Sequence, residues 1–159
     1  MDFDLVELES PPPYLPLFLR KLACQSAIEE EYIKKIYSEF KKGKTKIYLL
    51  LTPSVSEDII RGLVALSVSR LDNAPVVLID YIYIRPQDRK MDFEIGKGNF
   101  MKLSQLLVEF SIECALNVRK IVGVHLLILE PAHDKLIPFY KSLGFSQISK
   151  KSDWMYLKI

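Results

Sequence analysis

Gly96 and Gly98 stand between an apolar run and a long helical pattern, and this arrangement could bind an anion. The apolar run, Val76–Ile84, is rich in β-branched and aromatic residues and predicts a strand. At the start of a helix several backbone N–H groups lack a partner within the helix, and the positive end of the helix dipole lies there too. Glycines at this point let the backbone approach a phosphate closely. We therefore interpret Gly-Lys-Gly as an anion site; the alternative is a tight turn that binds nothing.

One carboxylate interrupts the same strand. Asp80 lies within Val76–Ile84, and burying a carboxylate without a function is costly. Asp80 therefore either faces solvent at a sheet edge or serves the chemistry of a site. His125 and His133 are the only histidines, which leaves no cluster for a metal ion. We find no Ser-His-Asp or Cys-His arrangement either, so a metal or a covalent nucleophile is not expected.

Size and composition predict a soluble globular protein. The 159 residues suffice for one domain with its own core, and we expect a single domain over residues 1–159. The net charge of +2 is too small to indicate a nucleic-acid-binding protein, and the short lysine clusters suit solvated element ends. No window reaches the ~20 apolar residues that span a bilayer, and the acidic N-terminus is unlike a signal peptide. Cys24 and Cys114 read as core thiols, so we expect a cytoplasmic location.

The elements that must position these residues follow from apolar periodicity. A first strand lies in Met1–Glu9, and two helices follow, one over Tyr14–Gln25 and one capped by Ser26 with Ile28, Tyr32, Ile36 and Phe40 facing inward. Three antiparallel strands come next, then a helix that contains Phe100 and Leu103 and ends near Asn117. The strand Val122–Leu129 should be parallel to Val76–Ile84 because a crossover helix connects them. A short helix and a final hairpin close a mixed α/β order, β-α-α-β-β-β-α-β-α-β-β; the hairpin strands are Phe145–Ser149 and Trp154–Ile159.

The segment Val124–Phe145 carries a recognisable pattern. A buried strand is followed by Glu130-Pro131-Ala132, a short helix with Phe139-Tyr140, and Leu143-Gly144-Phe145, where Gly144 can end the helix. This unit resembles the closing motif of the GCN5-related N-acetyltransferases, and the element order of the whole chain matches that family too. The resemblance implies a central, mostly antiparallel sheet with one parallel strand pair, acetyl-CoA as co-substrate, and direct attack of an amine on the thioester.

The resemblance also assigns roles to residues. Tyr140 fits the tyrosine beside the cofactor sulfur, a general acid for the leaving thiolate, with Phe139 next to it. His133 fits the polar position that contacts the pantetheine arm. Backbone groups of the last meander strand should bind pantetheine, and the Gly-x-Gly loop should hold the pyrophosphate; these residues are Ile82, Tyr83 and Ile84, and Gly96, Lys97, Gly98, Asn99, Phe100 and Met101.

The general base and the acceptor stay open at this stage. Base candidates near the expected cleft are Asp80, Glu94, Glu130 and His133. The acceptor can be the amine of a small molecule, a protein or an aminoacyl-tRNA, since parts of the chain are similar to the tRNA-acetylating toxins of toxin–antitoxin pairs. Ile95 and Phe100 depart from the usual glycine loop, so a third alternative is a degenerate domain that binds acyl-CoA without catalysis. A monomer and a homodimer both remain open.

Overall fold

The computed structural model describes residues 3–9, 19–20, 22, 24–54 and 58–159. Its main sheet has seven strands in the order β1-β2-β3-β4-β7-β9-β8. The pair β4–β7 is parallel, and the other neighbouring pairs are antiparallel. The predicted mixed architecture with one parallel pair is therefore confirmed. The strands of the sheet are β1 (Asp4–Glu7), β2 (Thr45–Thr52), β3 (Ile59–Leu71), β4 (Ala74–Ile84), β7 (Leu126–Leu129), β8 (Ser146–Gln147) and β9 (Met155–Lys158).

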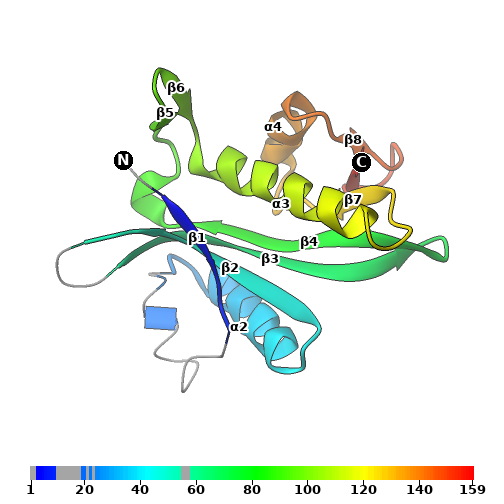
Figure 1. Ribbon diagram of the computed structural model, residues 1–159, viewed down its shortest axis with the longest axis horizontal. Coiled ribbons are helices and arrows are strands. Elements are labelled where there is room, and N and C mark those ends of the chain that lie inside the picture. Colours follow the sequence, from blue (N-terminus) through cyan, green and yellow to red (C-terminus); the bar gives the residue numbers. More distant parts are fainter. Residues whose placement is uncertain (1–2, 10–18, 21, 23, 55–57) are drawn as a thin grey trace.

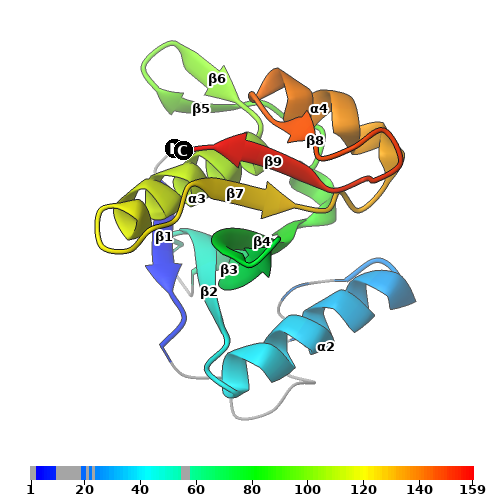
Figure 2. The same cartoon turned by 90° about the vertical axis from the view of Figure 1, so that its right-hand side faces the viewer.

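Helices cover both faces of this sheet. Helix α2 (Ala27–Lys41) lies on one face, and α3 (Leu103–Arg119) and α4 (Ile137–Ser142) lie on the other (Figures 1 and 2). Short 3-10 turns at Pro86–Asp88 and Asp134–Leu136 follow β4 and precede α4. Most of the predicted helix Tyr14–Gln25 falls outside the described residues. None of the described helices combines the length and apolar character needed to cross a membrane.

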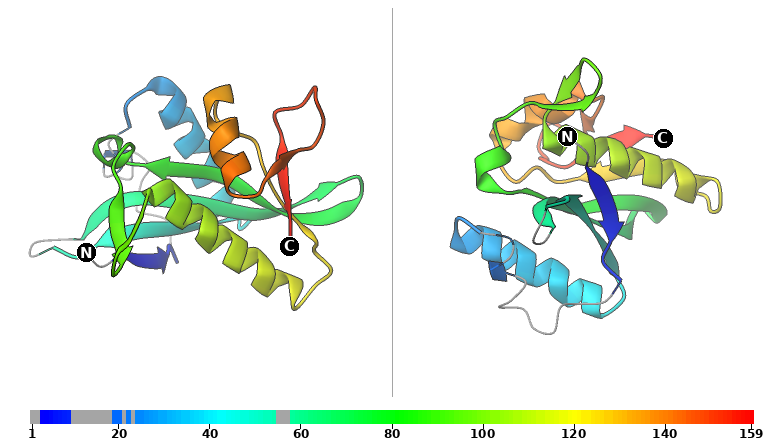
Figure 3. Two further views of the ribbon diagram at one scale, coloured as in Figure 1. Left: turned by 90° about the horizontal axis from the view of Figure 1, so that it is seen from above. Right: turned by 60° about the vertical axis from the view of Figure 1, so that its left-hand side comes forward.

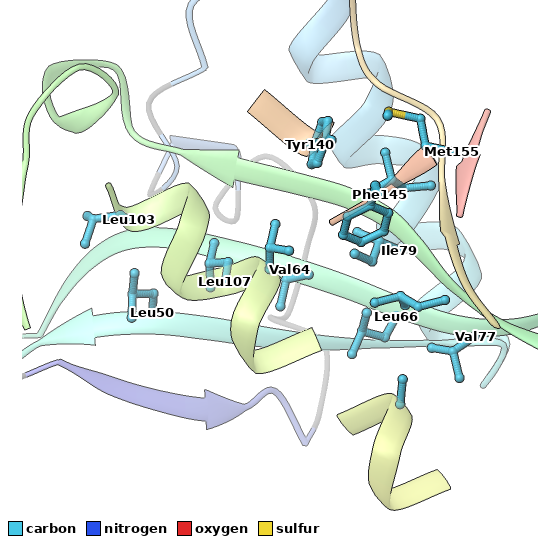
Figure 4. Close-up of a cluster of buried hydrophobic side chains, with 14 of the residues drawn as sticks. Leu50, Val64, Leu66, Val77, Ile79, Leu103, Leu107, Tyr140, Phe145 and Met155 are labelled. Atoms are coloured by element: carbon cyan, nitrogen blue, oxygen red, sulfur yellow. The ribbon is translucent and has the colours of Figure 1, made fainter. Parts of the chain in front are cut away.

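The sheet separates two apolar clusters because side chains alternate along each strand. In β3, Leu63 and Ala65 pack toward α2, whereas Val64 and Leu66 pack toward α3. Figure 4 shows the cluster on the α3 side, which joins the sheet to Leu103 and Leu107 and reaches Tyr140. The same core thus fixes the start of α3 and the position of α4, the two elements on which the predicted chemistry depends.

Helix α2 begins as predicted, but its inward face differs. The Ser26 hydroxyl accepts from the Glu29 backbone N–H at 3.2 Å, which confirms the N-cap. Ile33 and Tyr37 are buried beside Ile36, whereas Ile28 is 70% exposed and Tyr32 is 38% exposed. The prediction followed a spacing of four residues, which drifts around a helix of about 3.6 residues per turn. The inward stripe instead contains Ile33, Ile36, Tyr37 and Phe40.

A second hairpin, absent from the prediction, lies between β4 and α3. Its strands are β5 (Phe93–Gly96) and β6 (Asn99–Met101), which form a two-stranded sheet of their own. The hairpin stands out from the body beside the start of α3 (Figures 1 and 3). The Phe93 ring is buried on the body side, where it meets Phe3 edge-on with ring centroids 5.7 Å apart. The connection from β4 to α3 is therefore an ordered unit rather than a simple loop.

Candidate active site

Strands β4 and β7 part halfway along β4. They pair at three positions, ending with Ile79 opposite Leu129, and β7 stops there while β4 continues to Ile84. From Asp80 onward β4 pairs with β3 alone among the described strands. Backbone groups on this open edge can bind an extended molecule as a neighbouring strand would. The predicted pantetheine contacts Ile82, Tyr83 and Ile84 lie along it, although the Ile84 carbonyl already accepts from Arg89 Nε at 2.7 Å.

A β-bulge marks the point of parting. Ala65 of β3 pairs with Tyr81, and the next residue, Leu66, pairs with Ile79. Asp80 is therefore an extra residue of β4, with no residue opposite it in the β3–β4 register. Bulges bend a strand and redirect side chains, and they are frequent next to active sites. Here the bulge turns the Asp80 carboxylate toward α2, where its Oδ2 accepts from Thr45 Oγ1 at 3.2 Å. Burial raises the pKa of Asp80 above its ordinary value, against the lowering effect of its hydrogen bonds.

The start of α3 presents backbone N–H groups that could bind an anion. The residue before the helix, Lys102, makes no capping hydrogen bond through its side chain. The first bond of the α-helical pattern runs from the Leu106 N–H to the Lys102 carbonyl, so the N–H groups of Leu103, Ser104 and Gln105 precede the helical ladder. Leu103 is buried in the core and holds this end in place. The 17-residue helix thus presents N–H groups and the positive end of its dipole at one point.

The predicted glycine loop does not lie at the helix start, and that part of the prediction is wrong. Gly96 and Gly98 form the turn of the β5–β6 hairpin, where Gly98 has a φ of +76°, a conformation that favours glycine. The Glu94 carboxylate accepts from the Gly98 N–H at 2.9 Å and stabilises this turn. Phe100, expected inside the helix, pairs with Glu94 and is 63% exposed.

The hairpin forms around the Gly-Lys-Gly turn, and Phe93 and Ile95 alternate with polar Glu94 before it, a pattern typical of a strand. Lys97, Asn99 and Met101 lie in the hairpin as well, so the N–H groups at the helix end belong to later residues. The role of Gly96–Met101 as phosphate contacts stays a prediction. Their geometry is that of a hairpin beside the start of α3.

Tyr140 lies near the point where β4 and β7 separate, on the side of the sheet covered by α3. It is 8% exposed, and its ring packs edge-on against Phe145 with centroids 6.0 Å apart. Gly144, with a φ of +101°, ends α4 and allows the Phe145 N–H to bond the Tyr140 carbonyl at 3.1 Å. Figure 4 shows Tyr140 beside Phe145, Met155 and Ile79, the last residue of β4 that pairs with β7.

The Tyr140 hydroxyl forms no hydrogen bond with any described residue. Burial raises its pKa to about 12, so the hydroxyl stays protonated at neutral pH. The hydroxyl of a largely buried tyrosine normally has a hydrogen-bond partner. This one is therefore available as a donor to a bound molecule.

The other predicted residues are distributed unevenly. Asp80 lies next to the parting but faces α2, on the sheet face opposite Tyr140. Glu94 is engaged in the hairpin turn. His133 is exposed just before the turn Asp134–Leu136, and Glu130 is exposed directly after β7. Within the described part of the chain no three metal-binding side chains come together.

A buried ion network that the sequence did not indicate holds the site together. Asp88 is 3% exposed; both of its oxygens accept from Arg61 Nη1 at 3.1 Å, and Oδ2 accepts from Arg85 Nε at 2.5 Å. The Arg61 guanidinium also lies 5.7 Å from the centre of the Phe93 ring. The network thereby joins β3, the end of β4 and the hairpin that leads to α3. No local sequence pattern predicts this ion network, because Arg61 and Asp88 are far apart in sequence.

Solved structures share this architecture. The complex AtaTR bound with acetyl-CoA has a TM-score of 0.76 and 20% sequence identity over 99% of this chain and 93% of that one. The KacTA–DNA complex has a TM-score of 0.74 and 19% identity over 99% and 93% of the two chains. AtaT complexed with acetyl-methionyl-tRNAfMet has a TM-score of 0.72 and 17% identity over 99% and 95%. The chain has the GCN5-related N-acetyltransferase fold.

The acetyltransferase fold rests on three-dimensional likeness, since no protein-family model and no curated protein matches the sequence significantly. The likeness extends over nearly the whole chain and accounts for the order of the described elements. Two further neighbours are tyrosine-to-phenylalanine mutants of AtaT and KacT, with TM-scores of 0.74 each. Within this fold the β5–β6 hairpin is the feature that the family pattern did not predict.

Proposed function

We propose that the protein is an N-acetyltransferase that moves the acetyl group of acetyl-CoA to a primary amine. One observation carries the proposal: the unpartnered hydroxyl of the largely buried residue Tyr140, beside the point where β4 and β7 part. The open edge of β4 suits the pantetheine arm, and the N-terminus of α3 suits the pyrophosphate. The acetyltransferase fold supports the same assignment.

The reaction follows from these positions. Amine nitrogen attacks the thioester carbonyl, the new C–N bond forms, and the C–S bond breaks to leave a thiolate. Tyr140 donates its hydrogen bond to the sulfur as negative charge develops there. A thiol pKa of ~8.5 lies below the Tyr140 pKa of about 12. Donation of a hydrogen bond from a protonated tyrosine therefore stabilises the departing thiolate, while the one proton that the attacking nitrogen loses passes to the general base. Placing amine and thioester together supplies much of the remaining effect.

Asp80 is the base that we favour. It lies at the bulge beside the parting, and the raised pKa makes it a better proton acceptor than an exposed carboxylate. Its place on the α2 face lets an amine enter from that side, opposite Tyr140. Glu94 is less suited because the hairpin turn already uses it.

A second acceptor class is favoured by a specific observation. The structure of AtaT with acetyl-methionyl-tRNAfMet matches 99% of this chain, and other matching structures include the AtaT toxin bound to the C-terminus of the antitoxin AtaR. The amino group of an aminoacyl-tRNA is therefore a candidate acceptor for this protein, with an antitoxin as candidate partner. The free thiols Cys24 and Cys114 agree with a cytoplasmic location. A homodimer is a further proposal that the oligomeric state in solution will decide.

The experiment combines melting with turnover. Acetyl-CoA at 100 times its dissociation constant should stabilise the purified protein by about 2.7 kcal/mol. CoA release is then followed with small amines, a peptide amine and an aminoacyl-tRNA. No melting shift would refute acetyl-CoA binding. A shift without CoA release for any acceptor would indicate a domain that binds acyl-CoA without catalysis.

A further inference from the structure

The open edge of β4 presents its backbone groups at alternate residues. The Arg85 N–H bonds the Arg61 carbonyl of β3 at 2.9 Å, so the backbone groups of Arg85 point toward β3. In an antiparallel pair this direction alternates from one residue to the next. The N–H and carbonyl of Tyr83 therefore point toward β3 as well. A ligand that lies along the open edge meets the backbone groups of Ile82 and Ile84 instead.

Arg89 occupies one of these groups. Its Nε donates to the Ile84 carbonyl at 2.7 Å. The same guanidinium is held at its other end, where Nη1 donates to Gln25 Oε1 at 3.2 Å and Nη2 donates to the Glu29 carboxylate. It also lies 5.7 Å from the centre of the Tyr83 ring. The Glu29 side chain is only 15% exposed, which limits the screening of this ion pair by solvent. The Ile84 carbonyl is thus engaged before any ligand arrives.

This contact restricts how a pantetheine arm can pair with the edge. The arm carries amides, and an edge residue with both backbone groups free binds them at two points, as it would bind a neighbouring strand. Ile82 offers its N–H and its carbonyl, whereas Ile84 offers only its N–H. Pairing at Ile84 would shift the arm by two residues, about 6.6 Å, away from the parting and Tyr140. A hydrogen bond from Tyr140 reaches only ~3 Å, so the shifted register is unproductive.

We infer that Arg89 is a positioning residue that sets the register of the pantetheine arm on β4. By occupying the Ile84 carbonyl it directs the arm to Ile82, the register that brings the thioester to the parting. The inference rests on the proposed function and adds a residue that separates productive from unproductive binding of acetyl-CoA. Arg89 acts through the Ile84 carbonyl and takes no part in the transfer itself.

The kinetic test removes the arginine at saturating amine. Arg89→Met deletes every donor and keeps an unbranched side chain, and the freed Ile84 carbonyl then favours the shifted register by about 5-fold, the worth of one net hydrogen bond. We expect kcat, KM and the Kd of acetyl-CoA all to fall by about that factor. The ratio kcat/KM should stay within twofold, because it compares the free enzyme with the productive transition state only. An arginine that merely held the fold would lower kcat/KM instead.

The register is also observed without turnover, by NMR of the backbone carbonyls. Protein with carbonyl-¹³C isoleucine and ¹⁵N-labelled arginine and tyrosine gives separate signals for the Ile84–Arg85 and Ile82–Tyr83 bonds, with Ile60–Arg61 as internal reference. In the wild type, acetyl-CoA should shift the Ile82 carbonyl and leave the Ile84 carbonyl unchanged. In Arg89→Met, acetyl-CoA should shift both carbonyls.

Two further variants complete the test. Arg70→Met removes an arginine whose Nη1 donates to the Asn73 carbonyl at the other end of β4, and kcat, KM and Kd should not change. Glu29→Gln loosens the hold on Arg89 and keeps a residue that suits the capping box, so a smaller joint fall of kcat and KM should follow even if Arg89→Met folds poorly.

Three results would overturn the inference: wild-type kcat in Arg89→Met, a loss of kcat/KM beyond twofold in that variant, or a wild-type Ile84 carbonyl that shifts with acetyl-CoA. Absence of acetyl-CoA binding by the wild type would instead refute the proposed function.

Discussion

Ser104 offers a test in which stability and binding should change in opposite directions. It is the second residue of α3, at the end that presents free N–H groups and the positive pole of the helix dipole. A carboxylate in the first turn stabilises a helix by about 0.3–1 kcal/mol. Ser104→Asp should therefore raise the melting temperature by about 1–4 °C for a chain of this size.

The same charge should weaken acetyl-CoA binding. Side chains of a helix point toward its N-terminus, so the new carboxylate comes close to a bound pyrophosphate. Two like charges ~6 Å apart repel by about 3 kcal/mol at an effective dielectric constant of ~20. Salt reduces this to roughly 1–2 kcal/mol, a rise in Kd of about 5- to 30-fold.

Calorimetric titration with acetyl-CoA at low and high salt measures the effect, and the loss of affinity should shrink as salt rises. Asn117→Asp places the same charge near the other end of α3, where it should lower stability slightly and leave the Kd unchanged. A Ser104→Asp protein that melts higher and binds acetyl-CoA as tightly as the wild type would refute the phosphate site at α3.

Three further predictions concern the elements around the site. In Asp80→Asn the protein loses a carboxylate whose pKa burial raises. The wild type should therefore lose stability relative to the variant as pH rises from the unfolded pKa of ~4 through the higher folded pKa. Parallel melting curves that keep a constant gap from pH 4 to 8 would contradict this. Gly62→Ala places a Cβ 2.5 Å from the Tyr83 carbonyl oxygen and should destabilise by about 1–3 kcal/mol in a urea titration; an unchanged midpoint would show that β3 and β4 separate easily here. Leu107→Ala empties a fully buried position between α3 and the sheet and should cost about 2–5 kcal/mol, whereas Leu116→Ala at an exposed position of the same helix should cost under ~1 kcal/mol.

Much of the fold followed from the sequence because its signals are local. The β-branched runs of β2, β3 and β4 and the apolar spacing in α3 specify their own elements. Asp72 and Asn73, with φ values of 49° and 67°, form the tight turn that their residue types predict between β3 and β4. The end of α4 at Leu143-Gly144-Phe145 was predicted for the same reason, since the positive φ of Gly144 is a backbone conformation that favours glycine.

The features that sequence reasoning missed depend on distant contacts. The glycines were assigned to the start of α3 because a strand, a glycine pair and a helix follow each other. The alternation of Phe93 and Ile95 with Glu94 just before them is the local signal that favours a strand there. The burial of Asp88 by Arg61 and Arg85 joins segments with no common pattern. The inward face of α2 depends on how the helix packs on Ile47 and Tyr83, which periodicity alone leaves undetermined.

One experiment addresses the central claim directly. Acetyl-CoA with an isotope-labelled acetyl group is incubated with an amine acceptor, and mass spectrometry counts the CoA and the labelled amide formed by the wild type and by Tyr140→Phe. The wild type should form one amide for each CoA released. Since the Tyr140 hydroxyl bonds no described residue, Tyr140→Phe should keep its melting temperature and its affinity for acetyl-CoA, yet its kcat should fall by about 10²- to 10⁴-fold. CoA released without amide, or a Tyr140→Phe protein as fast as the wild type, would contradict the account.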